Sequence, residues 1–182
     1  MTLGTKADMR RLNKPGQAAR SILLLCAECV RDKEYSKRLV SVADNVAEAE
    51  AEYAKKGEAT SLFTIVSAGT IAGCVTIKDM EKLYTGTFSR KNSPVRYIYD
   101  EIKLAPRNSI CPLCAQRVVS TLDHYLPKSR HPAFAVTPLN LIPSCTDCNK
   151  AKLDLQPANA SELRIPVKAA SRTDVMAATV PL

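Results

Sequence analysis

Residues 111–153 form the most informative segment of the sequence and read CPLCAQRVVSTLDHYLPKSRHPAFAVTPLNLIPSCTDCNKAKL. It holds two Cys-x-x-Cys pairs with other polar residues between and after them: Cys111, Cys114, Asp123, His124, Cys145, Cys148 and Asn149. Thiolates suit a structural zinc ion, whereas carboxylate, amide and imidazole groups suit a hard cation at a reactive centre. Two metal chemistries are therefore interleaved in one short segment.

The four cysteines predict a structural zinc site. Four thiolates fill the coordination of a tetrahedral ion and leave no open position for a substrate. The 30 residues between Cys114 and Cys145 exceed the common zinc-ribbon spacing, so the gap must hold a structure of its own. A β-hairpin whose base is clamped by the metal fits such a gap.

Cysteine usage also indicates the compartment. The total of seven is odd, and the apolar run Ile22–Cys26 is too short for a signal peptide. We therefore expect a soluble, cytoplasmic protein with bound zinc rather than disulfides. Cys26 and Cys29 form a third Cys-x-x-Cys, but both belong to the apolar stripe of a predicted helix. A buried free cysteine behaves as a small hydrophobe, so we assign this pair to the core.

Length and composition limit the class of protein. A chain of 182 residues with 46% hydrophobic residues fits one domain, or one small domain with an appendage. No apolar run reaches the roughly 18 residues that cross a bilayer, so no membrane partner is expected. Residues 90–152 hold 10 Lys and Arg against 4 Asp and Glu, which is +6 of the net +8. A basic surface attracts polyanions such as nucleic acid, although a merely solvated basic protein stays an alternative.

The N-terminal part is predicted to be helical. From Gln17 the apolar residues fall on one helix face: Ile22, Leu25, Cys26, Cys29 and Val30. A second helix is predicted over Asp32–Lys56, with Gly57 as its C-terminal stop. Its apolar residues are spaced alternately four and three positions apart, as in a coiled-coil seam: Tyr35, Leu39, Val42, Val46, Ala49 and Tyr53. The two helices would form a hairpin that packs on the rest of the chain or on a partner subunit.

The segment after this hairpin holds two more helix signals. Residues 59–75 are small and apolar, and their pattern leaves strand and helix open. Thr76 with Asp79 is a capping signal for a helix through about Tyr84. Ser93-Pro94 predicts the start of another helix, with Ser as the cap and Pro in the first turn. The apolar side of that helix would consist of Val95, Ile98, Tyr99 and Ile102.

Between and after the cysteine pairs, the order turn, hairpin, helix is predicted. Arg117–Tyr125 is rich in β-formers and predicts the first strand, and Leu139–Pro143 predicts a short second strand. The loop Leu126–Pro138 joins them, and a helix begins at Asp147. The predicted fold class is therefore α+β, with a mainly helical region over residues 1–105, a hairpin-and-helix domain over 106–157 and an irregular tail over 158–182.

The order and spacing of these residues resemble the HNH endonuclease family, of the zinc-containing ββα-metal type. The likeness covers Cys111 to Leu153 and is carried by the cysteine pairs, Asp123-His124, Asn140 and Asn149. The chain departs from the family name at Asn149, where many members have a second histidine. Asn is a known variant there and still offers a ligand oxygen, so the resemblance implies a ββα-metal nuclease domain of the HNN variant.

The resemblance implies a role for each matching residue. His124 takes the place of the general base that activates water, and Asp123 that of a ligand of the catalytic divalent ion. Asn140 matches the central Asn, which pins the loop and helps to orient the base. Asn149 matches the third position, and its amide oxygen favours magnesium or manganese over a softer ion.

Elementary chemistry agrees with these roles. A neutral imidazole such as that of His124 can accept a proton from water near pH 7. One divalent ion on Asp123 and Asn149 can hold a phosphate oxygen and stabilise the departing alkoxide. Because neighbouring side chains on a strand point to opposite faces, a kink or a strand end near His124 is required.

Basic residues flank the motif and are candidates for phosphate contact: Lys128, Arg130, Lys150 and Lys152. A solvated basic face is the alternative for all four. His131, beside Pro132 in the loop, is expected to be a bystander, or at most a substitute ligand.

The sequence favours a metal-dependent endonuclease that cuts DNA, with RNA open as a second substrate, and with zinc and magnesium or manganese as its ions. The alternative is a zinc-stabilised module that binds nucleic acid or protein without cutting. Small HNH proteins serve as effectors in anti-phage or restriction systems. The family therefore implies a partner such as an ATPase subunit on the N-terminal helices.

Overall fold

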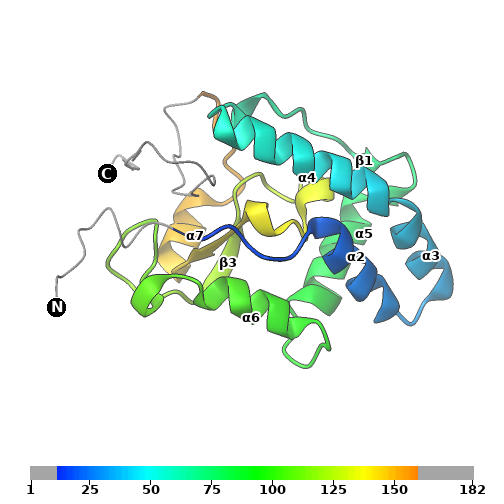
Figure 1. The fold of residues 1–182 in the computed structure, drawn as a ribbon, viewed down its shortest axis with the longest axis horizontal. Coiled ribbons are helices and arrows are strands. Elements are labelled where there is room, and N and C mark those ends of the chain that lie inside the picture. The colour runs from blue at the N-terminus through cyan, green and yellow to red at the C-terminus, as the bar shows by residue number, and fades with distance from the viewer. Residues whose placement is uncertain (1–11, 160–182) are drawn as a thin grey trace.

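The computed structural model describes residues 12–159 as a mixture of helices and short strands (Figure 1). Its main hairpin pairs β3 (Thr121–His124) with β4 (Leu141–Ser144), and helices surround it. Together with the clustered cysteines, this confirms the α+β prediction. Among residues 12–159, no helix is long and apolar enough to span a membrane. The predicted tail lies almost wholly outside the described residues.

Three helices replace the predicted N-terminal pair. α2 (Ala19–Glu28) packs against both α3 (Lys33–Ser41) and α4 (Ala43–Glu58). The single helix predicted over Asp32–Lys56 is wrong, because the chain leaves helical geometry at Val42, with φ −103° and ψ 8°. The hydroxyl of Ser41 donates to the backbone carbonyl three residues earlier, a local bond that favours a bend. The break lets both α3 and α4 pack on α2.

The ends of these helices differ from the prediction in one place. Asp32 caps α3 by accepting a hydrogen bond from the N–H of Tyr35 at 3.0 Å. Gly57, however, lies inside α4, which continues to Glu58, so the predicted glycine stop is wrong.

Cys26 is fully buried in the core and Cys29 is half-buried against it, which confirms the assignment of that pair.

A small hairpin occupies the segment that the sequence left open. β1 (Thr70–Ile71) pairs antiparallel with β2 (Val75–Thr76), and Gly73 with φ +72° supplies a left-handed residue of the turn. α5 (Ile77–Leu83) starts directly after β2 with the predicted capping box: Asp79 N–H donates to the Thr76 hydroxyl, and the Asp79 carboxylate accepts from the Thr76 N–H. The capping prediction is confirmed.

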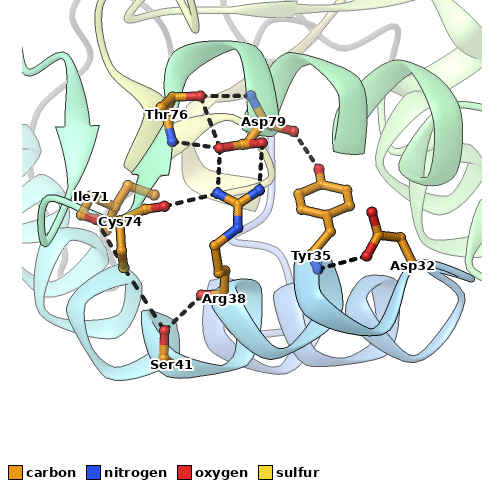
Figure 2. Close-up of polar contacts among 8 residues, drawn as sticks. All are labelled: Asp32, Tyr35, Arg38, Ser41, Ile71, Cys74, Thr76 and Asp79. Carbon is orange, nitrogen blue, oxygen red and sulfur yellow. Dashed lines mark hydrogen bonds and ion pairs between the residues drawn. The ribbon is translucent and has the colours of Figure 1, made fainter.

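One polar cluster ties α3 to the hairpin and to α5 (Figure 2). The guanidinium of Arg38 donates to both carboxylate oxygens of Asp79, at 2.8 and 3.0 Å, and to the carbonyl of Cys74 at 2.9 Å. The hydroxyl of Tyr35 donates to the backbone carbonyl of Asp79. Asp79 therefore caps its own helix and receives a bidentate partner from α3 at the same time.

α6 (Arg96–Leu104) covers the free edge of the main hairpin. Its predicted apolar side is confirmed, since Val95, Ile98, Tyr99 and Ile102 are all buried. The predicted Ser93 cap is wrong, because the helix starts later and the Ser93 hydroxyl is buried without a hydrogen-bond partner among the described residues.

The main hairpin is shorter than predicted at its first strand. β3 begins at Thr121, and the predicted stretch before it contains an isolated bridge between Val118 and Ile110 in place of a continuous strand. In register, Leu122 faces Pro143. The N–H of Leu122 donates to the hydroxyl of Tyr99 at 3.2 Å, so α6 supplies an acceptor at the edge of β3.

A single large core joins the N-terminal helices to the main hairpin. It unites residues from α2, α3, α5 and α6 with residues from β3, β4 and the loop between these strands: Ile22, Leu39, Leu83, Ile98, Leu122, Val136 and Leu141. A second, smaller cluster joins Tyr53 of α4 to Leu126, Phe134 and Ile142. The helical hairpin thus packs on its own chain, which was one of the two predicted arrangements. A foreign partner stays a prediction.

Replacement of Asp79 by Asn should lower stability by about 2 kcal/mol at pH 7, because it removes a charged cap and a bidentate partner. The Arg38 guanidinium holds the pKa of Asp79 well below its usual range, so the stabilisation is present above the unfolded pKa of about 3.9 and is lost as the pH falls through the folded pKa. Urea unfolding should therefore show a wild-type advantage that shrinks below about pH 4.

The control is Asp44→Asn, which removes an exposed ion pair with Arg20. It should change stability little at any pH. An Asp79→Asn deficit that is equal at pH 7 and pH 3 would contradict the assignment.

Candidate functional site

The four cysteines of the two pairs form one cluster. The Sγ atoms of Cys111, Cys114, Cys145 and Cys148 all lie within 4.8 Å of one another. Zinc–thiolate bonds of about 2.3 Å in a tetrahedron place neighbouring sulfurs about 3.8 Å apart. The Sγ atoms of Cys114 and Cys145 are 3.9 Å apart, which fits that requirement. The cluster can hold a metal ion such as zinc.

Hydrogen bonds of backbone groups hold the cysteines of the cluster in position. The N–H of Cys111 donates to the carbonyl of Arg117 at 2.7 Å, and the N–H of Ala115 donates back to the carbonyl of Cys111 at 2.8 Å. The N–H of Cys145 donates to Sγ of Cys111 at 3.3 Å. Burial raises the pKa of Cys111 and of Cys148, whereas at Cys114 hydrogen bonds from backbone N–H groups and from neighbouring cysteines outweigh burial and bring the pKa to about 7. Cys114 is therefore the most readily ionised of these three thiols.

His124 is the last residue of β3, so the strand end that the sequence analysis required is present. Its Nε2 lies 2.9 Å from the carbonyl oxygen of Ala135. A carbonyl only accepts, so Nε2 carries the proton and the neutral ring keeps Nδ1 as an acceptor. Burial lowers the pKa of His124 to about 3, and the ring is therefore neutral at physiological pH.

Asn140 fixes the loop that supplies this carbonyl. The side chain is fully buried; its Oδ1 accepts from the N–H of Leu126 at 2.8 Å, and its Nδ2 donates to the carbonyls of Leu126 and Phe134 at 3.0 and 3.2 Å. Phe134 directly precedes Ala135. Asn140 stands at the end of the loop and therefore holds its beginning and its middle, and it acts on His124 through the backbone of Phe134 and Ala135.

Asp123 is buried next to His124 and faces a cation of the chain itself. The Nζ atom of Lys152 lies 3.7 Å from Oδ1 of Asp123, and the two side chains are only 5% and 8% exposed. Lys152 also donates to the backbone carbonyl of His124. Burial raises the pKa of Asp123 and lowers that of Lys152, and each shift is opposed by the charge of the partner.

α7 (Thr146–Lys152) carries Asn149 and Lys152 against β3. Residues three apart lie on the same face of a helix, so the half-buried Asn149 shares the face on which Lys152 meets Asp123. Asp123, His124 and Asn149 thus come from two elements that pack together, and Asn140 holds the loop that follows His124.

The four basic residues do not form one exposed face. Arg130 and Lys150 are exposed and Lys128 is half-buried, whereas Lys152 is buried in its ion pair. Lys152 is therefore a part of the site interior and not of a solvated surface. His131 is buried as well, with Nε2 2.8 Å from Oε1 of Gln156, an interaction that gives it a structural role.

Tyr84 is a further residue of the site that was not predicted from the sequence. The ring of Tyr84 meets the imidazole of His124 edge-on, with centroids 4.6 Å apart and planes at 62°. Nζ of Lys128 lies 5.9 Å from the centroid of the same Tyr84 ring. No sequence signal near Tyr84 points to chemistry, because its apolar ring fits the helix pattern equally well.

Among curated proteins, the chain is similar to Protein ea31 of Escherichia phage lambda. The two are 29% identical over 148 residues, which cover 78% of this chain and 50% of that protein. The chain thus spans about half the length of that relative, whose name states no activity. No family model matches the chain, and no solved structure matches it.

Removal of bound zinc should destabilise the protein by at least about 5 kcal/mol, because folding of small zinc sites draws on the free energy of metal binding. Metal analysis should find one zinc per chain, and Cys111→Ser should lose it. Cys74→Ser is the matched control, since Cys74 is an exposed cysteine outside the cluster. A zinc-free protein with unchanged thermal stability would contradict the cluster's assigned role.

Asn140→Ala should cost about 3 kcal/mol, because it leaves buried backbone groups of Leu126 and Phe134 without partners. Asn149→Ala, on the half-buried face of α7, should change the free energy of unfolding by less than about 1 kcal/mol. Urea denaturation compares the two variants. Equal losses would show that Asn140 does not hold the loop.

Proposed function

We propose that the protein is a metal-dependent endonuclease that hydrolyses phosphodiester bonds in DNA. The observation that carries this proposal is the environment of His124. Nε2 is held by the Ala135 carbonyl, which leaves Nδ1 as the acceptor of the ring, and the neighbouring residue Asp123 is buried as well. A neutral imidazole with one nitrogen anchored is the arrangement that a general base requires.

Residues suited to the other parts of a phosphodiesterase lie on β3 and on α7, which pack together. The residues that would hold a divalent ion are Asp123 and Asn149, whose oxygens suit magnesium or manganese. When bound, such an ion would neutralise charge on the phosphate and on the leaving oxygen. Nδ1 of His124 takes the proton from water. A phosphodiester beside the ring adds negative charge, which raises the pKa of the imidazole and makes it a stronger base.

The basic side chains of this part of the chain favour a polyanionic substrate. The segment 90–152 carries +6, and exposed Arg130 and Lys150 lie close in sequence to the proposed reactive residues. Lys152 adds a buried positive charge next to Asp123. The four cysteines would hold zinc and keep β3 and α7 in place, and the zinc would take no part in the reaction.

A second candidate is a zinc-stabilised module that binds nucleic acid without cutting. The observation in its favour is the ion pair between Lys152 and Asp123, which gives Asp123 a structural reason to be buried. In that case the site needs no divalent ion, and Asp123 serves to anchor α7 on β3.

Plasmid cleavage with and without magnesium or manganese separates the two candidates. His124→Ala should lower the cleavage rate by about 10²- to 10⁴-fold, because general-base help is worth that much. The matched control is His131→Ala, which removes the other histidine of the chain and should leave the rate within about threefold.

The outcomes are distinct. The nuclease proposal fails if folded, zinc-loaded protein does not cut duplex DNA, single-stranded DNA or RNA with either ion. Salt-dependent DNA binding that ignores both magnesium and His124→Ala would then support the binding module.

A further inference from the structure

An unusual helix end brings Tyr84 to the site. α5 does not stop at Leu83 but widens into a π-helical turn, η2 (Tyr84–Phe88). The N–H of Ser89 donates to the carbonyl of Tyr84 at 2.8 Å, and the hydroxyl of Ser89 donates to the same oxygen at 2.9 Å. Single π-helical turns are rare and frequently occur at functional sites.

The side chain that this turn delivers ends against the proposed base. The rings of Tyr84 and His124 are edge-on at 4.6 Å, and the two residues are 8% and 6% exposed. Two buried rings in this geometry attract each other by about 0.5–1.5 kcal/mol beyond the area they bury. The contact joins the N-terminal region directly to the end of β3.

We propose that Tyr84 is a positioning residue whose ring holds the His124 imidazole in the orientation that its reaction requires. The inference rests on the proposed nuclease function. The hydrogen bond from Nε2 to Ala135 is a single contact that breaks when the imidazole turns about its Cβ–Cγ bond, and this torsion is broad in histidine. The Tyr84 ring blocks this turn from the side and keeps Nδ1 in one direction.

The ring of Tyr84, and not its hydroxyl, holds the His124 imidazole in place. Burial is the largest of the effects that raise the pKa of Tyr84, and the Asp123 carboxylate adds to it, so the phenol stays protonated. The side chain offers no negative charge to the imidazole. Tyr84→Phe should therefore retain function, whereas a smaller aliphatic side chain without a ring should not.

Tyr84→Leu tests the orientation, with Tyr53→Leu as the matched control. Tyr53 is also a buried tyrosine, 5% exposed, and it meets Phe134 edge-on at 5.3 Å and 63°. Both variants lose a similar ring and a similar aromatic contact, but only Tyr84 touches His124. Loss of alignment by about 1 Å can cost on the order of 100-fold in rate.

In cleavage assays, Tyr84→Leu should lower kcat by at least about tenfold and leave KM within about threefold. Tyr84→Phe and Tyr53→Leu should both keep kcat within about threefold of the wild-type protein. Unchanged kcat in Tyr84→Leu, or an equal loss in Tyr53→Leu, would overturn the proposal.

A second readout does not depend on cleavage. The sequence has only 2 histidines, so long-range nitrogen NMR resolves both imidazoles. Wild-type protein and Tyr53→Leu should show His124 as a single tautomer protonated at Nε2, and Tyr84→Leu should show an averaged one. An unchanged His124 spectrum in Tyr84→Leu would overturn the positioning role even if the protein is a nuclease. A changed spectrum in a protein that never cuts would refute the nuclease alone.

Wild-type protein provides the test if Tyr84→Leu does not fold. Protons of two rings whose centroids are 4.6 Å apart give a strong nuclear Overhauser effect between Tyr84 and His124. Its presence supports the contact on which the proposal stands, and its absence overturns the proposal.

Discussion

The geometry of the candidate site depends on a hairpin that is too small to stand alone. β3 and β4 pair over four residues each, and an isolated two-stranded hairpin is marginal at best in water. Three supports surround it. The cysteine cluster joins the start of β3 to the end of β4, Tyr99 bonds the free edge at Leu122, and Asn140 closes the loop beyond His124. The orientation of the proposed base follows from all three.

The N-terminal helices belong to this support and are more than an appendage. Core side chains of α2, α5 and α6 pack with Leu122 and Leu141 of the hairpin, so the same apolar contacts stabilise both regions. The bidentate pair of Arg38 and Asp79 fastens α3 to α5, and α5 leads into the turn that carries Tyr84. A change in the helices can therefore reach His124 through continuous packing.

Sequence patterns predicted the local features well. The spacing of the cysteine pairs predicted one cluster, Thr76 with Asp79 predicted a capping box, and the apolar face of α6 was read correctly from its period. Each of these signals is carried by residues that lie a few positions apart or that would bind the same metal ion. The catalytic and nucleic-acid roles assigned by resemblance stay predictions, because neither the fold nor the one relative described above tests them.

The features that the sequence did not predict depend on distant neighbours. The break at Val42 exists because two segments pack on α2, and the π-helical turn at Tyr84 exists within a core shared with β3. Lys152 looked like a surface cation, yet the long reach of its side chain takes the ammonium to buried Asp123. Hydrogen exchange of a zinc-loaded fragment of residues 106–159 tests the dependence on these neighbours most directly. The amides of Leu122 and Leu126 should exchange at least about 100-fold faster in the fragment than in the full chain. Equal protection in both would show that the hairpin does not depend on the N-terminal helices.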